Sequence, residues 1–313
     1  MVRAKEILKT AVDMFSKAGL QSPVFDAMCL LEECVGRNAR TQVISGGEID
    51  ERAAERFMEL CRRRLSSPLQ YVVGEWDFGG LPLLLGEGVL IAREDTLLLV
   101  DCAEEQLRAA GASANGAGAS CEVGSPCEAK ATCAVSSPRI LDLCAGSGAV
   151  GLLLANRMKS AEVVCAELSE EAFFYLNQNI DRHGGGRVTA LRADVLTPPA
   201  AEMGEGMYDA IVSNPPYIRS GDISSLQWEV QKEPVMALDG GEDGLVFYRS
   251  IAEQWTPLLK DGGLLAFEIG FDQARQVCEI MEKANFENIE VKTDLSGNDR
   301  VIYGTLNKKF RKI

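Results

Sequence analysis

The sequence contains a single histidine, His183, among its 313 residues. A His-rich zinc centre is therefore excluded, and a nucleophilic triad with a histidine could use only this residue. His183 precedes three glycines, Gly184–Gly186, a pattern typical of a helix C-terminus. We expect this histidine to end a helix.

Basic residues are also scarce. The chain has 32 Lys and Arg against 46 Asp and Glu, a formal net charge of −14. This balance is unfavourable for a protein that neutralises many phosphates of DNA or RNA. We expect no direct nucleic-acid partner, and we interpret the most basic spot of the N-terminal part, Arg62–Arg64, as a solvated helix face.

Long apolar runs are missing as well. Apolar segments such as Leu81–Leu85 are far shorter than the roughly 20 residues of a membrane helix. Glu6, Lys9 and Asp13 interrupt the N-terminal segment, where a signal peptide would have its apolar core. We expect a cytoplasmic monomer without a membrane partner. Most of its ten cysteines lie in apolar segments and are expected to be small buried residues in a reducing compartment.

Residues 106–138 lack aromatic residues, and Ala, Gly, Ser and Cys dominate. This composition predicts a flexible low-complexity insertion. Cys121, Cys127 and Cys133 recur at a spacing of six. Thiolate zinc sites have shorter spacers and a fourth ligand, so we expect no metal here.

The patterning divides the chain into three regions. Apolar positions at helical spacing predict a small helical domain over residues 1–70, with one helix starting at Ser22–Pro23 and another over residues 51–65. Glycines punctuate short extended runs over residues 71–90, which predicts a β-hairpin linker. Residues 91–313 form the third region.

After Pro138, extended apolar runs alternate with helical patterns. Strands are expected at 139–143, 162–166, 187–191, 209–213, 263–269, 289–293 and 301–305, and helices at 149–158, 170–182, 245–259 and 273–284. This alternation predicts an α/β fold with a doubly wound, mostly parallel sheet. Ligands bind such sheets at the carboxyl ends of the strands.

A glycine-rich turn follows the first of these strands. It carries G-x-G-x-x-G at Gly146, Gly148 and Gly151, with Glu167 about 20 residues further on. This pattern is typical of dinucleotide sites, so an NAD-dependent oxidoreductase is one candidate.

Asp142, at the end of the same strand, favours a different cofactor. Its carboxylate would repel a pyrophosphate, with no Lys or Arg nearby in the sequence to offset the repulsion. S-adenosylmethionine has no phosphate and carries an ammonium and a sulfonium. Under this hypothesis Glu167 accepts hydrogen bonds from the ribose hydroxyls, and Asp194, past the third strand, accepts from the adenine amine.

The segment Ser213–Tyr217, with the sequence Ser-Asn-Pro-Pro-Tyr, follows a hydrophobic strand. A rigid turn would explain the prolines but not the amide before them or the aromatic ring after them. The nitrogen of an amide or an exocyclic amine is a weak nucleophile, so catalysis needs acceptors that hold its NH₂ in place. Asn214 offers a side-chain oxygen, Pro215 a carbonyl, and Tyr217 a flat face for a planar group. This segment predicts methyl transfer to a planar nitrogen.

In these motifs the chain resembles the bacterial release factor glutamine methyltransferase family, over nearly all its length except 106–138. The resemblance extends to further segments, namely residues 69–78, 89–96, 233–234, 237–245, 267–270 and 294–300. It implies a small N-terminal helical domain that selects the protein substrate, a β-hairpin linker and a seven-stranded, Rossmann-like methyltransferase domain.

The resemblance also implies the reaction and the site. Family members use S-adenosylmethionine to methylate the glutamine of the Gly-Gly-Gln motif in peptide chain release factors. The implied cofactor residues are Cys144, Ala145, Gly146, Ser147, Gly148, Glu167 and Val195, together with Asp142, Asp194 and Asn214. The glutamine would be held by Asn214, Pro215, Pro216 and Tyr217.

The chain departs from the family at the linker arginine, Arg93, where Ala92 and Glu94 replace two prolines. Glu167 stands where Asp is common. Three alternatives share part of this evidence, namely glutamine methylation of a ribosomal protein, adenine-N6 methylation of nucleic acid, and a cofactor-binding interaction module without catalysis. The negative charge opposes the second, and the intact Asn214 opposes the third.

Overall fold

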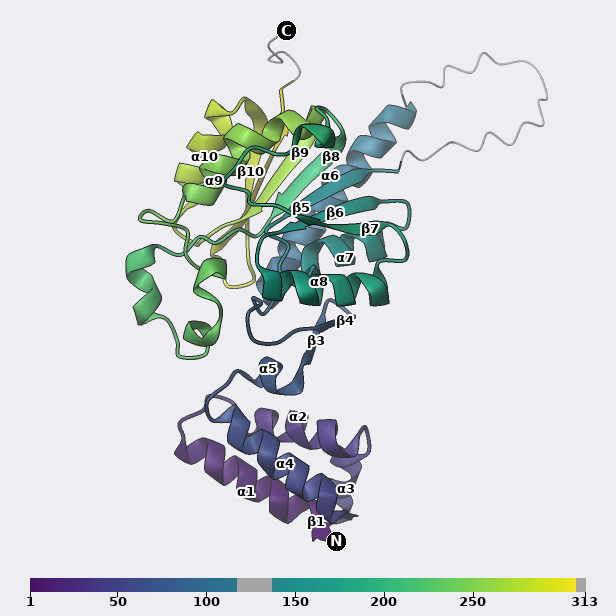
Figure 1. The fold of residues 1–313 in the computed structure, drawn as a ribbon, viewed down its shortest axis with the longest axis vertical. Coiled ribbons are helices and arrows are strands. Elements are labelled where there is room, and N and C mark those ends of the chain that lie inside the picture. Colours follow the sequence, from purple (N-terminus) through teal and green to yellow (C-terminus); the bar gives the residue numbers. More distant parts are fainter. Residues whose placement is uncertain (117–136, 308–313) are drawn as a thin grey trace, which may run out of the picture. The chain divides into compact units, whose positions relative to one another are not determined.

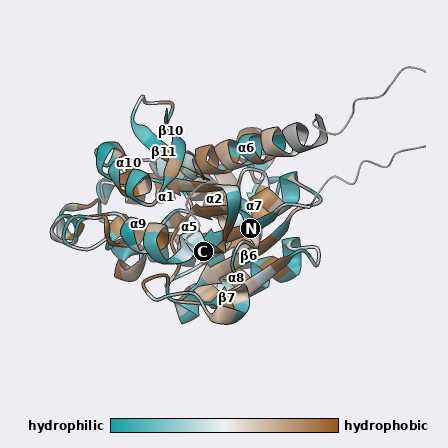
Figure 2. Ribbon diagram, turned by 90° about the horizontal axis from the view of Figure 1, so that it is seen from above, coloured by the Kyte–Doolittle hydropathy of each residue, from teal (hydrophilic) through white to brown (hydrophobic). Residues whose placement is uncertain are grey.

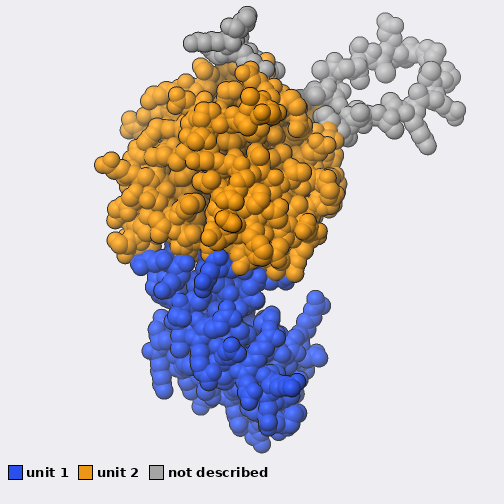
Figure 3. Space-filling model, viewed as in Figure 1, with its two compact units in different colours: residues 1–76, 85–87, 228–232 blue, residues 77–84, 88–227, 233–313 orange. Residues whose placement is uncertain are grey.

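The computed structural model describes residues 1–116 and 137–307. The chain forms two compact units (Figure 3). Unit 1 comprises residues 1–76, 85–87 and 228–232, and unit 2 comprises residues 77–84, 88–227 and 233–313. Unit 1 therefore takes five residues from the second half of the sequence.

Unit 1 is built from short helices around its own apolar core. Its elements are β1 (Val2–Arg3), α1 (Ala4–Lys17), α2 (Pro23–Val35), α3 (Ala39–Ser45), β2 (Glu48–Ile49), α4 (Glu51–Arg64) and α5 (Leu69–Val73). Pro23 is the first residue of α2, and the Asp50 carboxylate caps α4 by accepting from the Ala53 N–H at 2.8 Å. Both predicted helix starts are confirmed, since proline and a capping carboxylate suit the first turn.

The hairpin is shorter than predicted. Residues 71–73 belong to α5, which ends at Gly74 in a left-handed conformation (φ 82°). The helix forms because the Tyr71 and Val72 side chains are buried. Strands β3 (Glu75–Phe78) and β4 (Leu81–Leu84) then form the two-stranded sheet.

A seven-stranded sheet forms the centre of unit 2, with the strand order β10-β11-β9-β8-β5-β6-β7 (Figure 1). The strands are β5 (Arg139–Leu143), β6 (Glu162–Glu167), β7 (Val188–Arg192), β8 (Tyr208–Ser213), β9 (Leu259–Glu268), β10 (Phe286–Thr293) and β11 (Asp299–Leu306). Strands β5 to β9 pair in parallel, and β11 pairs antiparallel with both β9 and β10. The predicted α/β fold with a mostly parallel sheet is confirmed.

Helices cover both faces of this sheet. One core contains residues of α6 (Leu97–Gly116), α7 (Ala149–Arg157) and α8 (Glu170–His183), and the other contains residues of α9 (Val246–Ser250) and α10 (Ala274–Lys283). On β5, Ile140 points into the first core and Leu141 and Leu143 into the second, the alternation expected of a strand buried on both faces. Figure 2 shows hydrophilic and hydrophobic residues alternating along α10.

No helix within residues 1–116 and 137–307 is long and apolar enough to cross a membrane. The remaining elements of the structure are short helical turns. The turns are η1 (Glu94–Thr96), η2 (Ala201–Met203), η3 (Ser220–Ser225), η4 (Val230–Lys232), η5 (Val235–Ala237), η6 (Ile251–Trp255) and η7 (Thr256–Leu258). Helix α8 ends at His183, as predicted, and the Nε2 atom of this histidine lies 2.7 Å from the Pro82 carbonyl oxygen.

The first part of the predicted insertion is a helix. Helix α6 extends to Gly116, so the prediction was wrong for residues 106–116. Leu99, Ala103 and Leu107 recur at every fourth position and are buried, and Glu104 forms an ion pair with Arg108 one turn away. This periodicity favours helix despite the Ala-rich composition. Residues 117–136, with Cys121, Cys127 and Cys133, lie outside the described residues.

The helix predicted over residues 245–259 is broken into three parts. Helix α9 passes into the π-helical turn η6 and then into the 3₁₀ turn η7. Pro257 lies in η7 and has no N–H to continue an α-helical ladder, which explains the change of hydrogen-bond pattern. Residues 263–268 of the strand predicted next form the end of the longer β9.

The described cysteines are mostly shielded from water. Cys61, Cys102 and Cys165 are buried, as predicted, whereas Cys29, Cys34, Cys144 and Cys278 are half-buried. Burial raises the pKa of the Cys61 thiol to about 12 and that of Cys102 to about 11.

Arg64 contradicts the prediction of a solvated arginine face. Arg62 and Arg63 are exposed, but Arg64 is buried. Its guanidinium donates to the Asp26 carboxylate at 2.9 Å, to the Ser67 carbonyl at 3.1 Å and to the Glu229 carboxylate. Helical periodicity turns the third arginine of the run into the core, where acidic partners compensate its charge.

We therefore expect Arg64→Ala to destabilise unit 1 by about 3–5 kcal/mol, because a buried carboxylate, Asp26, loses its cationic partner. Unfolding in urea, followed by the fluorescence of Trp76 and Trp228 in a Trp255→Phe background, reports on this unit. The matched control Arg63→Ala, at an exposed position, should change stability by less than about 0.5 kcal/mol. Equal effects of the two substitutions would contradict the assignment.

Candidate cofactor and substrate site

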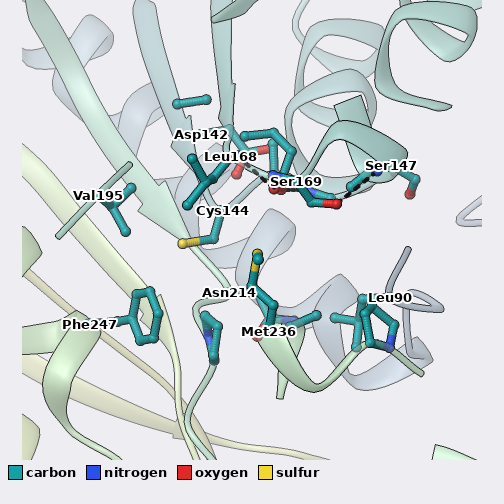
Figure 4. Close-up of a pocket in the computed structure, with 18 of the residues that line it drawn as sticks. Leu90, Asp142, Cys144, Ser147, Leu168, Ser169, Val195, Asn214, Met236 and Phe247 are labelled. Carbon is teal, nitrogen blue, oxygen red and sulfur yellow. Dashed lines mark hydrogen bonds between the residues drawn. The ribbon is translucent and has the colours of Figure 1, made fainter. Parts of the chain in front are cut away.

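A cavity of about 210 Å³ lies at the carboxyl ends of the parallel strands of unit 2 (Figure 4). Ten of the predicted site residues line it, namely Asp142, Cys144, Ala145, Gly146, Ser147, Glu167, Asp194, Val195, Asn214 and Pro216. In Figure 4, Asp142 and Ser147 lie on one side of the cavity and Asn214, Met236 and Phe247 on the opposite side.

Strand register brings these residues together. In the parallel pairs, Leu143 of β5 lies opposite Ala166 of β6 and Ser213 of β8. The chain therefore leaves three neighbouring strands at the same edge of the sheet, as expected for parallel strands.

The glycine turn connects β5 to α7 through left-handed backbone conformations. Cys144 and Gly146 have φ of 57° and Gly148 has φ of 87°. A Cβ atom on Gly148 would approach Leu176 Cδ1 to 2.7 Å, so this position requires glycine on both grounds. Gly148 does not line the cavity. It allows the turn to lead into α7.

Asp142 is buried at the start of this turn, and its Oδ2 atom accepts from the Gly151 N–H at 2.8 Å. A Cβ atom on Gly151 would lie 2.9 Å from that oxygen. The pKa of Asp142 is raised from 3.8 to about 7, chiefly by burial and to a smaller extent by the charge of Glu167, against the opposing effect of the Gly151 hydrogen bond. The carboxylate therefore both lines the cavity and holds the first turn of α7.

Glu167 ties the end of β6 to the glycine turn. Its Oε2 atom accepts from the Gly146 N–H at 2.8 Å, and Oε1 accepts from the N–H groups of Leu168 and Ser169, both at 2.7 Å. Each carboxylate oxygen has two lone pairs, so Oε1 is fully used and Oε2 retains one lone pair for a donor from a ligand in the cavity.

Asp194 and Val195 form the wall beyond β7. The Asp194 Oδ1 atom accepts from the Leu196 N–H at 2.9 Å, which makes a local turn. The Val195 carbonyl accepts from the Ser250 hydroxyl at 2.6 Å and from the Trp255 indole N–H at 3.0 Å. These two bonds fix the loop against the helices that follow.

Asn214 lies directly after β8 and donates through Nδ2 to the Thr96 hydroxyl at 3.3 Å. No residue within 1–116 and 137–307 donates to its Oδ1 atom. Because the nitrogen end of the amide is engaged, the oxygen end is left as a hydrogen-bond acceptor.

Two of the predicted substrate residues do not line the cavity. Pro215 is buried, and the Tyr217 ring packs against the core beside α9 and α10. The Tyr217 hydroxyl donates to the Glu268 carboxylate at 3.3 Å, and its carbonyl accepts from the Gln273 amide at 2.9 Å. The Tyr217 side chain therefore faces the core and not the cavity.

The linker arginine keeps an extended backbone without flanking prolines. Arg93 has φ −93° and ψ 154°, and Glu94 begins the turn η1. Glu233, which is buried, accepts from the Ile91 N–H at 3.0 Å and from the Arg93 guanidinium. Ala92 lines the cavity. Two prolines would restrict the φ angles of the linker backbone. In this chain the hydrogen bonds from Ile91 and Arg93 to Glu233 restrict the same segment.

Sequence reasoning did not identify several lining residues, among them Leu90, Thr96, Met236 and Phe247. Leu90 and Thr96 lie in the segment 89–96, which carries the family resemblance. That resemblance could have been used to predict them as site residues. Met236 and Phe247 stand in segments without a chemical motif, so their place in the wall follows from the tertiary fold alone.

The raised pKa of Asp142 predicts a pH effect on stability. Between about pH 4 and 7 the folded protein keeps a proton on Asp142 that the unfolded chain releases, so stability falls as the pH rises through this window. The contribution is at most about 1.4 kcal/mol per pH unit. Asp142→Asn keeps an acceptor for the Gly151 N–H but does not ionise. Urea unfolding at pH 5, 6 and 7 should show a shallower fall for the variant, and identical slopes would refute the shift.

Comparison with known proteins identifies the family. The PrmC N-terminal domain family matches residues 6–74, and the Methyltransferase small domain family matches residues 128–260. Among solved structures, the hMettl16 catalytic domain in complex with MAT2A 3'UTR hairpin 1 has a TM-score of 0.54 and 11% identity over 85% of each chain. At that identity the likeness shows the fold.

Relatives match over nearly the whole sequence. The release factor glutamine methyltransferase of Clostridium botulinum is 33% identical over 303 residues, covering 95% of this chain and 97% of the relative. That of Chlorobaculum tepidum is 33% identical over 300 residues, covering 94% of each. The chain therefore belongs to the release factor glutamine methyltransferase family.

Proposed function

We propose that this protein transfers a methyl group from S-adenosylmethionine to the side-chain nitrogen of the glutamine in the Gly-Gly-Gln motif of peptide chain release factors. The observation that carries the proposal is the placement of Asn214 in the same cavity as the glycine turn. The identity to release factor glutamine methyltransferases over most of the chain supports the substrate.

The charge of the cavity suits a cationic cofactor. Glu167 and Asp194 line it together with Asp142, whose pKa burial raises to about 7, and none of the lining residues is Lys, Arg or His. A pyrophosphate would meet carboxylates without compensation, whereas an ammonium and a sulfonium are attracted to them. The residues therefore fit S-adenosylmethionine and not NAD. When bound, this cofactor supplies the methyl group on its sulfonium.

Catalysis requires the substrate nitrogen to be held in line with that methyl group. The lone pair of an amide nitrogen is delocalised, so orientation and preorganised acceptors account for the acceleration. We assign the Oδ1 atom of Asn214, which lines the cavity, as an acceptor for the glutamine NH₂. Pro216 forms the adjoining wall.

Selection of the protein substrate is assigned to the N-terminal region. All the lining residues of the cavity belong to unit 2, and a glutamine side chain offers too few atoms to distinguish one protein from another. Unit 1 matches the PrmC N-terminal domain family and supplies a separate surface.

Adenine-N6 methylation is the alternative that shares the Asn-Pro-Pro-Tyr chemistry. The net charge of −14 and the acidic cavity oppose a nucleic-acid substrate. Glutamine methylation of a ribosomal protein uses the same cavity chemistry, so transfer assays with release factors, ribosomal proteins and oligonucleotides in parallel decide between these substrates.

Removal of the Glu167 carboxylate should weaken cofactor binding. We expect Glu167→Ala to cost about 1.5–3 kcal/mol in binding of S-adenosylmethionine, as for hydrogen bonds to a charged acceptor. Isothermal titration calorimetry measures this. Glu170→Ala, at an exposed position in the first turn of α8, is the matched control and should bind normally. An unchanged affinity of Glu167→Ala, or binding of NAD by the wild type, would count against the assignment.

Asn214→Ala tests the chemistry directly. We expect methyl transfer to slow by about 10²–10³-fold while cofactor affinity changes little, because the lost interaction is made most fully in the transition state. Mass spectrometry should place one methyl group on the Gly-Gly-Gln glutamine of a release factor, and a Gly-Gly-Glu variant of that factor should accept none. Methylation of adenine by the wild type, with release factors ignored, would overturn the substrate.

A further inference from the structure

Asn179, on α8, carries a buried amide that has no part in the function proposed above. Its side chain is fully buried and forms hydrogen bonds with three backbone groups. The Nδ2 atom donates to the carbonyls of Leu84 and Ser147, both at 2.9 Å, and the Oδ1 atom accepts from the Leu84 N–H at 2.7 Å. One side chain therefore connects two segments that are far apart in the sequence.

These three bonds require an amide at position 179. An asparagine side chain has two N–H donors and one carbonyl acceptor, and here both donors and the acceptor are used. A carboxylate could not donate to the two carbonyls, and an apolar side chain would leave all three backbone groups without this partner, which is costly inside a protein. The bonding pattern also fixes the orientation of the amide.

Both connected segments form walls of the cavity. Ser147 belongs to the glycine turn and lines the cavity. Leu84 is the last residue of β4, and the chain that follows lines the cavity at Gly88, Leu90 and Ala92. We call residues 82–84 and 88–92 the linker segment. Asn179 thus bonds both the glycine turn and the start of the linker segment.

The linker segment has a second polar contact with the same face of α8. His183, one turn after Asn179, has its Nε2 atom 2.7 Å from the Pro82 carbonyl oxygen. Residues four apart share a face of a helix, and residues two apart share a side of a strand. Asn179 and His183 therefore contact Leu84 and Pro82 in register. Figure 1 shows β4 next to this helix.

Close packing on α8 restricts both segments. A Cβ atom on Gly88 would lie 2.6 Å from the Glu171 Cβ atom, and one on Gly148 would lie 2.7 Å from Leu176 Cδ1. Each segment thus lies directly against the helix. Because Asn179 shares its two N–H groups between them, a shift of either segment along α8 disturbs the amide that holds the other.

We propose that Asn179 is a positioning residue that couples the glycine turn to the linker segment, so that cofactor binding at the turn and docking of the linker segment on α8 stabilise each other. The inference rests on the proposed function for the identity of the cofactor. Such coupling is reciprocal. The factor by which the docked linker segment raises cofactor affinity is also the factor by which the cofactor stabilises docking.

The Leu84 N–H reports on docking, because Asn179 is its acceptor. In ¹⁵N-labelled full-length protein, hydrogen exchange followed by NMR should be about 10-fold slower at Leu84 when S-adenosylmethionine is added to saturation. The control amide is Gly80, which donates to Asp77 Oδ1 at 3.0 Å within the same hairpin and should change by less than about twofold. No response at Leu84, or an equal response at Gly80, would overturn the proposal.

Asn179→Ala and His183→Ala separate coupling from docking. Both remove a contact between α8 and β4, but only Asn179 also bonds the glycine turn. We expect Asn179→Ala to bind S-adenosylmethionine about 10-fold more weakly in calorimetry, with Leu84 exchange that is fast with or without the cofactor. His183→Ala should bind within about twofold of the wild type and keep the response of Leu84.

Equal losses of affinity in the two variants would show a purely structural role of the helix face and contradict the coupling. Urea unfolding gives the folded fraction of each variant. If Asn179→Ala does not fold, the exchange of Leu84 and Gly80 in the wild type decides the proposal.

Calorimetry on the wild type separates this inference from the proposed function. A wild type that binds S-adenosylmethionine without slower exchange at Leu84 would overturn the coupling and leave the proposed cofactor standing. A wild type that binds no S-adenosylmethionine would overturn the proposed cofactor, and the coupling with it.

Discussion

The parallel pairing of β5 with β6 and β8 is the constraint on which the site depends. Leu143 lies opposite both Ala166 and Ser213, so the next residues of all three strands emerge at one edge. A slip of one residue in either pair would turn Glu167 or Asn214 to the other face of the sheet. The hydrophobic cores on the two faces fix the register, because Ile140 of β5 is buried in one core and Leu141 and Leu143 are buried in the other.

Two buried carboxyl groups of unit 2, Asp142 in the lining of the cavity and Glu268 outside it, would not be selected for stability alone. Asp142 is buried with one backbone donor, and Glu268 keeps an oxygen without a partner among the described residues. Both carboxyls have a raised pKa through burial, which is a cost to the folded state. Perturbed groups of this kind gather at functional sites, and Asp142 lines the cavity that we propose for a cofactor free of phosphate.

Arg64 shows how the loop after the Asn-Pro-Pro-Tyr segment contributes to unit 1. Glu229 and Trp228 follow Tyr217 by about a dozen residues, yet both contact this buried arginine, Trp228 with its ring centroid 5.5 Å from the guanidinium carbon. A few residues further on, Glu233 holds Arg93 and the linker backbone. One loop therefore provides an acidic partner to each of two arginines, the half-buried Glu229 to Arg64 and the buried Glu233 to Arg93.

The sequence by itself determined the fold class and the glycine turn, because these depend on local patterns: strand and helix periodicity and glycines at fixed offsets. It also sufficed for the family. Only the tertiary structure decided that the Tyr217 ring packs against the core and that Arg64 is buried. It alone brought Thr96 and Phe247 into the cavity wall and Glu268 next to Asn214. Each of these positions is set by partners that are mostly far away in the chain, and no local spacing encodes which distant side chain will compensate a buried charge or complete a wall.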